Sequence, residues 1–185
     1  VQDYSEKVLI LCPSQEILSQ NYDKFHSIGG TASIYSAALK SKEIGHVTYA
    51  SIGSIKKLGK FFKSKGVSLL ITDEAHLGTS ASEGMFKTFL KDLSPKYNIG
   101  FTATPFRLAT YTDVMGYKYS QLNMLNRTRP KLFSNFIHVT QIQELIKKNY
   151  WNDYDTETYE FDTNGLFLNS TGAEFNQESL ESINK

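Results

Sequence analysis

Two short polar strings follow apolar segments of this sequence, and their residue types could do chemistry. Asp73-Glu74-Ala75-His76 comes directly after the apolar run 68–72, and Thr102-Ala103-Thr104-Pro105 comes after the run 98–101. Neighbouring side chains in a strand point in opposite directions, so Asp73 and Glu74 would face different ways. One carboxylate could hold Mg²⁺, while the other orients and deprotonates an attacking water. Because Mg²⁺ takes few protein carboxylates together with substrate phosphates, the pair suits nucleotide hydrolysis. The alternative for an isolated Asp-Glu pair is a polar turn.

The segments around these strings have the pattern of a parallel α/β sheet. Residues 7–12 form a continuous apolar run, as expected for a strand that is buried on both faces, and Pro13 ends it. Further strands are predicted at 34–35, 46–50, 68–72 and 98–101, with helical patterns after Ser14, after Ser51 and around Phe86. This alternation predicts a parallel sheet with helices on both faces, which binds ligands at the carboxyl ends of its strands. Both polar strings fall at such ends.

The rest of the chain gives weaker predictions. Residues 106–135 are rich in Tyr, Asn and Thr and are predicted to be irregular, with one helix. Capping-box spacing occurs at Ser80 and Glu83 and again at Thr140 and Gln143, where the second box would open a helix with a buried apolar stripe. The alternating segment 154–162 predicts a strand of a separate unit.

Composition excludes several classes of protein. The chain has 185 residues, of which 40% are hydrophobic and 13% aromatic, enough for one domain and a little more with a real core. The single cysteine, Cys12, excludes an internal disulfide and a multi-cysteine zinc site, and its position predicts a core residue. No apolar run is long enough to span a bilayer, and no signal-peptide pattern opens the sequence, so we expect a cytosolic protein.

Charge is distributed unevenly along the chain. Residues 1–150 carry 19 Lys and Arg against 11 Asp and Glu, a net charge of +8, whereas residues 151–185 have a net charge of −7. Either these are solvated faces of one domain, or a basic body that meets a polyanion precedes an acidic segment with another role. The five lysines from Lys56 to Lys65 have the same two interpretations, a solvated face or a contact with phosphate. Trp151, with its tyrosine neighbours, either anchors packing or stacks on a base.

Several segments together resemble one family. Motifs II and III of superfamily-two helicases of the DEAH-lettered kind resemble the strings LLITDEAH and NIGFTATPFR. Their motif Ia is similar to VLILCPSQEILSQNYDKF, and the next family segment resembles IYSAALKSKEIGHVTYASIGSIKK. The closest likeness is to the phage and bacterial branch related to type I and type III restriction translocases. The resemblance implies a RecA-like sheet of the P-loop NTPase type, and a helicase or translocase that couples hydrolysis of Mg-ATP to movement on DNA.

The resemblance also implies a role for each matching residue. Asp73 would hold Mg²⁺ through water, and Glu74 would be the general base for water attacking the γ-phosphate. His76 would link the nucleotide site to Thr102-Ala103-Thr104-Pro105, which would couple it to the nucleic acid. Arg107 either touches phosphate or lies on the surface, and Ser14 and Ser54 have the alternative role of helix caps. The residues expected along the backbone of one nucleic-acid strand are Pro13, Ser14, Gln20, Ser51, Gly53 and Ser54.

One element of the family pattern does not occur. The phosphate-cradling loop G-x-x-x-x-G-K-[ST] has no match in these residues. We expect it upstream of Val1, on a strand beside the strand that precedes Asp73. Residues 1–135 would then be a first RecA-like lobe without its P-loop strand, and residues 136–185 a linker helix with the start of a second lobe. Such a chain would be inactive alone.

The expected partners follow from this organisation. They are DNA, single- or double-stranded and with RNA left open, and the remainder of the helicase polypeptide, with no membrane. Two other functions stay open. One is a restriction-type translocase that moves on duplex DNA without separating its strands, and the other is a nucleic-acid-binding module without catalysis.

Overall fold

The computed structural model describes residues 4–79, 84–127, 131–158, 165–167 and 176–183. The chain divides into two compact units, of which the first comprises residues 1–107 and 123–134 and the second residues 108–122 and 135–185. The first unit contains the segments that carry both polar strings.

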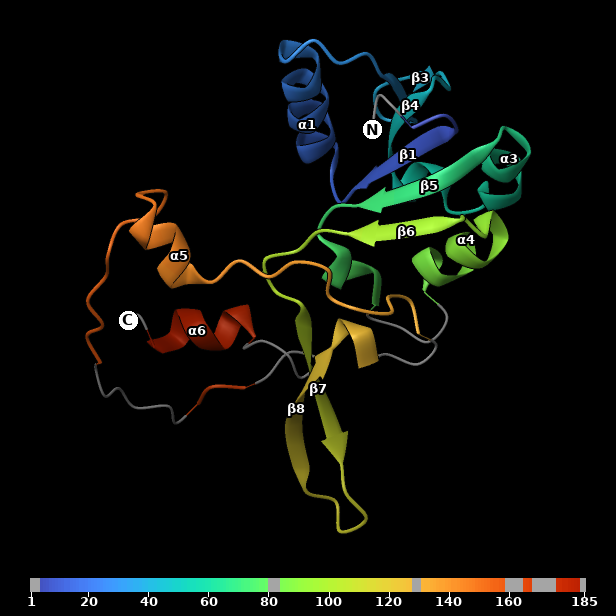
Figure 1. The fold of residues 1–185 in the computed structure, drawn as a ribbon. Helices are drawn as coiled ribbons and strands as arrows, with labels where there is room; N and C mark the ends of the chain where they lie inside the picture. The colour runs from blue at the N-terminus through green and yellow to red at the C-terminus, as the bar shows by residue number, and fades with distance from the viewer. Residues whose placement is uncertain (1–3, 80–83, 128–130, 159–164, 168–175, 184–185) are drawn as a thin grey trace. The chain divides into compact units, whose positions relative to one another are not determined.

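A six-stranded sheet is the centre of the first unit (Figure 1). Its strand order is β3-β2-β4-β1-β5-β6, and β2 pairs antiparallel with β3 while all other neighbours pair parallel. This confirms the predicted α/β class with a mostly parallel sheet. The strands are β1 (Lys7–Cys12), β2 (Ser33–Ser36), β3 (Ser41–Lys42), β4 (Val47–Ser51), β5 (Val67–Thr72) and β6 (Tyr97–Gly100).

Strand β1 lies inside the sheet, between β4 and β5. Leu11 is the register partner of Ala50 on one side and of Thr72 on the other. All residues of β1 from Val8 onward are buried, because helices cover both faces of the sheet here. The continuous apolar run of the sequence therefore has the structural cause that was predicted for it.

Helices cover the two faces of the sheet unequally. Helix α1 (Gln15–Ser27) packs over β1 and β4 on one face, whereas α2 (Ile52–Ile55), α3 (Gly59–Ser64) and α4 (Met85–Leu93) lie on the other (Figure 1). Among the described residues, no helix is long and apolar enough to cross a membrane.

Local signals explain where these helices begin and end. The Ser14 hydroxyl accepts a hydrogen bond from the Ile17 amide, so it caps α1 as the sequence suggested. Gly66 adopts φ 84° directly after α3, a conformation that glycine takes without strain. The capping box at Ser80 and Glu83 lies outside the described residues.

The position expected for a missing strand is wrong. Strand β5, which precedes Asp73, already has β1 on one side and β6 on the other. Within the described residues, the unpaired edge on this side of the sheet belongs to β6. No further strand can therefore pair with β5, the strand that precedes Asp73.

The prediction of an irregular segment is also wrong for residues 106–124. Strands β7 (Phe106–Thr112) and β8 (Lys118–Met124) form a two-stranded hairpin, followed by the short 3-10 helix η2 (Leu125–Arg127). The Asp113 carboxylate accepts hydrogen bonds from the amides of Met115 and Tyr117, and Gly116 adopts φ 88°. These contacts close the turn without the Asn-Gly or Asp-Gly pair that signals a hairpin in a sequence.

The end of the chain departs further from prediction. Helix α5 (Ile142–Lys147) forms, but it has no side-chain cap and no buried residue, so the predicted buried stripe is wrong. Residues 154–158 have no regular structure, and the rest of the strand predicted at 154–162 lies outside the described residues. Trp151 is 55% exposed and does not anchor packing. Helix α6 (Gln177–Ile183) follows.

Candidate active site

Two neighbouring parallel strands deliver the polar strings to one edge of the sheet. Asp73 follows β5 and Thr102 comes shortly after β6, at the carboxyl ends of both strands. The Phe101 amide donates a hydrogen bond to the Thr72 carbonyl, and the Ala75 amide donates to the Phe101 carbonyl, each at 2.9 Å. These backbone bonds hold the two strings against each other, as the position of each string after an apolar run predicts.

The Asp73 carboxylate is held from two sides. Its Oδ1 accepts a hydrogen bond from the Glu74 amide at 3.0 Å, and its Oδ2 accepts one from Asn21 Nδ2, also at 3.0 Å. Asn21 Nδ2 also lies 3.7 Å from the sulfur of Cys12. Helix α1 therefore fixes the orientation of this carboxylate from outside its own strand.

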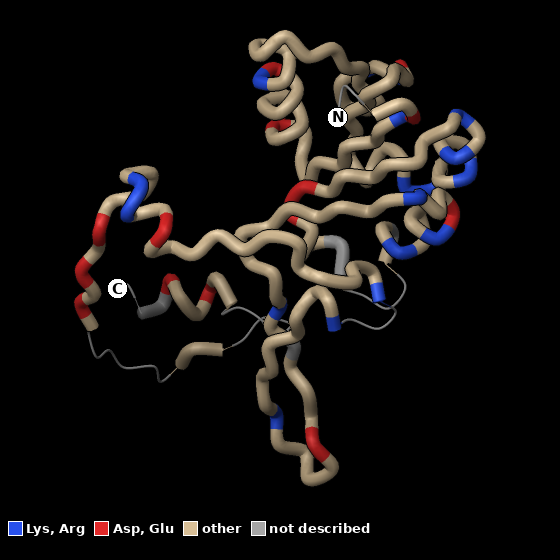
Figure 2. Tube along the Cα trace, viewed as in Figure 1, with Lys and Arg blue, Asp and Glu red and all other residues tan. Residues whose placement is uncertain are grey.

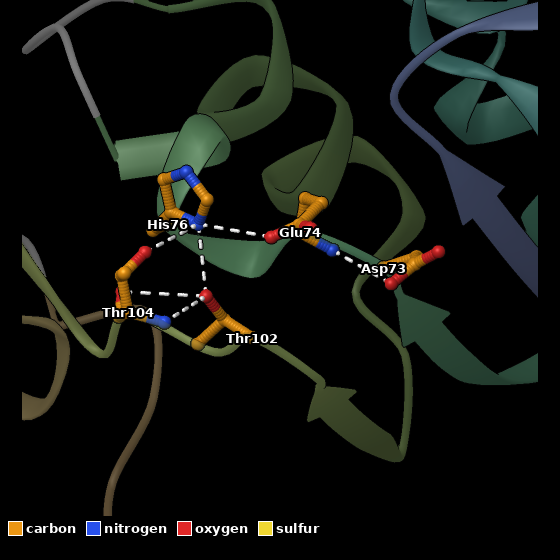
Figure 3. Close-up of polar contacts among 5 residues, drawn as sticks. All are labelled: Asp73, Glu74, His76, Thr102 and Thr104. Atoms are coloured by element: carbon orange, nitrogen blue, oxygen red, sulfur yellow. Dashed lines mark hydrogen bonds and ion pairs between the residues drawn. The ribbon is translucent and has the colours of Figure 1, made fainter. Parts of the chain in front are cut away.

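Glu74 has an uncommon backbone conformation. Its φ is 47°, in the left-handed region that a residue with a Cβ enters at a cost of about 1–2 kcal/mol. The turn reverses the chain between β5 and the 3-10 helix η1 (Ala75–Thr79), and it directs the Glu74 and Asp73 side chains apart (Figure 3). Local strain of this kind is concentrated at functional sites.

His76 connects the two polar strings. Its Nδ1 lies 3.2 Å from Glu74 Oε2, 2.8 Å from Thr102 Oγ1 and 3.3 Å from Thr104 Oγ1 (Figure 3). The Thr104 amide donates to Thr102 Oγ1, which orders the turn after β6. The side chain of His76 is 22% exposed and that of Glu74 is 42% exposed, so the cluster is open to a ligand at the sheet edge.

The other two residues of the second string, Ala103 and Pro105, lie beside this cluster. Ala103 lies exposed between the two threonines, and the carbonyl of Pro105 accepts a hydrogen bond from the Leu125 amide. The string is thereby joined to η2, the short helix after β8. Arg107 is half-buried in β7, and no described contact assigns it a role in the cluster.

The residues expected to contact nucleic acid lie at the carboxyl ends of β1 and β4. Pro13 and Ser14 follow β1, and Ser51 ends β4. Ser54, inside α2, accepts a hydrogen bond from the Ala37 amide, and its hydroxyl lies 2.9 Å from that of Ser51. Because β1, β4, β5 and β6 are parallel, this second group occupies the same edge of the sheet as the acidic pair.

Gln20 and Gly53 have no comparable contacts. Gln20 is exposed on α1, and Gly53 is exposed in α2, with open space where a side chain would start. The residue that sequence reasoning missed is the neighbour of Gln20, Asn21. It is a polar residue inside the apolar stripe of α1 formed by Ile17, Leu18 and Tyr22, and that interruption was the signal available.

An open pocket of about 370 Å³ lies beside Asp73. Asn21, Lys24 and Phe25 line it from α1, while Ile71 and Phe101 line it from the sheet. Lys24 is the cation among its lining residues. The pocket gives Asp73 an approach from the face that α1 covers incompletely.

The donor set can be compared with what Mg²⁺ requires. Within the described residues, no group of three His, Cys, Asp or Glu side chains is arranged to hold a metal ion. One carboxylate at an open sheet edge instead suits Mg²⁺ that keeps its waters and binds phosphate oxygens as well. The site therefore fits Mg²⁺ together with a nucleotide, and does not fit a metal ion held by protein alone.

The fold and the site define a class of protein. A parallel sheet with an Asp-Glu-Ala-His turn after one strand and a Thr-Ala-Thr turn after the next, joined through the histidine, is the arrangement of a RecA-like lobe of superfamily-two helicase type. The family model described as type III restriction enzyme, res subunit, matches residues 1–107, and the chain belongs to this family.

The chain is also similar to solved structures, at low identity. Two structures of the UvsW helicase from bacteriophage T4 are 21% identical to the chain over 54% of its length, each with a TM-score of 0.40. The chain spans 38% of the first of these structures and 22% of the second. A likeness of this size carries no functional argument. No curated protein matches the sequence.

Proposed function

We propose that this chain is the larger part of the first motor lobe of an ATP-dependent DNA helicase or translocase. In this proposal residues 1–135 form the lobe without its phosphate-binding loop, and residues 136–185 lead into a second lobe. The observation that carries the proposal is the histidine contact. One ring nitrogen of His76 lies 3.2 Å from the Glu74 carboxylate and 2.8 Å from the Thr102 hydroxyl, so a single side chain touches both polar strings.

Asp73 and Glu74 would divide the work of hydrolysis. Asp73, held by Asn21 and by the Glu74 amide, would contact Mg²⁺ through water. Mg²⁺, when bound, would neutralise charge on the nucleotide phosphates. Glu74 would orient a water molecule for attack on the γ-phosphate and accept its proton. The left-handed turn separates the two carboxylates, which suits two different tasks.

His76 would transmit the state of this site to the neighbouring strand. His76 Nδ1 contacts Glu74, Thr102 and Thr104, so a change in the hydrogen bonding of Glu74 would alter the hydrogen bonds between His76 and the two threonines. Thr102 in turn holds the Thr104 amide, so the turn after β6 can respond to the nucleotide. Coupling of this kind needs an element with two arrangements that both sites bias, and this turn is our candidate.

The serine-bearing turns after β1 and β4 would contact a nucleic-acid backbone. The Ser14 hydroxyl accepts a hydrogen bond from the Ile17 amide and keeps a proton that it can donate to a phosphate. In the hydrogen-bonded pair of Ser51 and Ser54 one hydroxyl donates to the other, which leaves one proton of the pair for a phosphate. Backbone contacts from hydroxyls and helix N-termini position a nucleic acid without reading its sequence. Pro13, Gln20, Ser51 and Gly53 would line the same path.

The family assignment favours a second candidate function. The matching family is that of a restriction-enzyme subunit, and a restriction-type motor would pump duplex DNA without separating its strands. The two candidates share the site and differ in the product. Displacement of a labelled strand from a forked duplex would indicate a helicase, whereas displacement of a triplex-forming strand without duplex opening would indicate a translocase.

The test of the site is Glu74→Gln in the complete protein. This change keeps the shape of the side chain but removes the base, so we expect DNA-stimulated ATP hydrolysis to fall by about 10²-fold or more while ATP and DNA still bind. Glu43→Gln, at an exposed loop glutamate, is the matched control and should hydrolyse ATP normally. Near-normal turnover by Glu74→Gln would place the base elsewhere.

His76→Ala separates coupling from chemistry. We expect ATP hydrolysis to persist while its stimulation by DNA is lost, because the contact between Glu74 and Thr102 is removed. Full stimulation of this variant by DNA would contradict the coupling role of His76 and leave the role of Glu74 intact.

A further inference from the structure

Five exposed lysines lie along α3 and the loop segments that flank it. We call them the lysine strip. All five are exposed, whereas Ile55 just before them, and Gly59 and Phe62 between them, are buried. Figure 2 shows basic residues gathered around α3. The members of the strip are Lys56, Lys57, Lys60, Lys63 and Lys65.

The strip has little charge compensation. The sequence contains no Asp or Glu between Glu43 and Asp73, so no acid shares its helices. The packed helix α4 adds Asp92, which lies against Gly59, but it also adds Lys87 and Lys91. Among the described residues no ion pair involves the strip. Lys65 is placed over the ring of Phe61, with its Nζ 5.4 Å from the centroid.

This arrangement is costly for the isolated protein. Lys60 and Lys63 are three residues apart on α3, a spacing at which like charges on a helix repel, and Lys56 and Lys57 are adjacent in the loop before it. A polyanion laid along the strip would remove that repulsion and release its own counterions. The arrangement is therefore better suited to a bound polyanion than to water alone.

The position of the strip relates it to the proposed function. It begins two residues after Ser54, at the carboxyl edge of the sheet, and ends at Lys65, just before β5 starts at the opposite edge. It thus runs from the serine turn at the carboxyl ends of the strands to the edge where their amino ends lie. Its long, flexible ammonium groups provide point charges, which suit phosphates and do not read bases.

We propose that the lysine strip is a second DNA-backbone contact that extends the path of the nucleic acid from the Ser51–Ser54 turn along α3. The inference rests on the proposed function, because it requires DNA at that turn. It adds a contact that lies away from the nucleotide site and that acts whether or not a nucleotide is bound.

The test compares salt dependence of binding in three variants of the full chain. One carries Lys56→Gln, Lys60→Gln and Lys63→Gln, the second carries arginine at the same positions, and the control carries Lys40→Gln, Lys42→Gln and Lys147→Gln. The probe is a fluorescent duplex with a single-stranded tail. Each lost phosphate contact lowers the slope of log K against log salt by about 0.7–0.9, so the strip variant should lose about 2–3 in slope.

Each outcome decides the proposal. A reduced slope in the strip variant, restored by arginine and absent from the charge-matched control, supports it. Equal slopes for the strip and control variants overturn it and leave the proposed function standing, since the wild-type chain still binds. Failure of arginine to restore binding also overturns it, because charge is then not the cause. If the wild-type chain does not bind the probe even at low salt, both proposals fail.

Discussion

At the scale of single residues, Asn21 contacts both Asp73, a candidate catalytic residue, and Cys12 in the core. Its amide nitrogen contacts Asp73 Oδ2 at 3.0 Å and lies 3.7 Å from the Cys12 sulfur, so a helix, a central strand and the acidic turn meet at one side chain. Cys12 is 2% exposed, in agreement with its prediction as a core residue. A thiol near a carboxylate proposed to sit at the nucleotide site gives a chemical reporter of that site.

The reactivity of Cys12 should therefore report its surroundings. Burial, and to a lesser extent the charge of Asp73, raise the pKa of the Cys12 thiol from 9.0 to about 11. Because the thiolate is the nucleophile, we expect alkylation by iodoacetamide at about pH 8 to be slower by about 100-fold than in the urea-unfolded chain, from ionisation alone. The rate should then rise about tenfold per pH unit until the pKa is reached.

Asp73→Asn provides the comparison. It removes a negative charge that raises the pKa of Cys12, so alkylation at a fixed pH should become faster. A folded wild-type chain that reacts as fast as the unfolded chain would show that the thiol is not buried, and an unchanged rate in Asp73→Asn would show that the charge of Asp73 does not act on it.

At the scale of elements, the contact between α3 and α4 depends on the absence of a side chain. A Cβ built on Gly59 would lie 2.6 Å from the Asp92 Cβ, 2.7 Å from the Phe89 carbonyl oxygen and 2.9 Å from the Leu93 amide nitrogen. Two of these atoms are backbone, which cannot rotate away. The helix pair covers the face of the sheet where Phe62 and Phe89 are fully buried.

Gly59→Ala should consequently destabilise the protein. We expect the free energy of unfolding to fall by about 1–3 kcal/mol, as for other overpacked cores, measured by urea denaturation. The control is Gly53→Ala in the preceding helix, where nothing lies within 4 Å of the added methyl group. Gly53→Ala should be neutral or slightly stabilising because alanine favours helix. Equal stability of the two variants would mean that α3 and α4 do not approach as closely as described.

Some elements of the fold could be predicted from the sequence and others could not. Strand β1 could be predicted because burial on both faces leaves a continuous apolar run, and β5 could be predicted from its Leu-Leu-Ile segment. The residues after both strands are then confined to one sheet edge. The β7–β8 hairpin could not be predicted, because the Asp113 side chain closes its turn and the sequence has no Asn-Gly or Asp-Gly pair there. Asn21 was missed because its partner is 52 residues away and α1 alone does not reveal it.

At the scale of the molecule, the family match and the structural units share one boundary. The match ends at residue 107, which is also where the first continuous part of the first unit ends. The acidic turn, the histidine contact and the lysine strip all lie within this part. The candidate motor chemistry is thus concentrated in one compact unit.

We predict that residues 1–185 alone do not hydrolyse ATP. Phosphoryl transfer depends on positioning and charge stabilisation, and the sequence has no G-x-x-x-x-G-K-[ST] string to hold the β- and γ-phosphates. Asp73 and Glu74 without such a loop present two negative charges to a polyanion. Phosphate release should stay at background with and without single-stranded DNA. Turnover that disappears in Glu74→Gln would demonstrate a nucleotide site built without that loop.

The central place of β1 has a consequence for how the sheet assembles. β1 precedes in sequence both strands that flank it, so its backbone groups stay unpaired until β4 and then β5 have been added. Each pairing of β1 requires a long loop to close first, which makes folding slow and exposes the segment Val-Leu-Ile-Leu-Cys in the meantime. Short apolar β-formers without charge are aggregation hazards, so recovery of native protein should depend on keeping the refolding chain dilute.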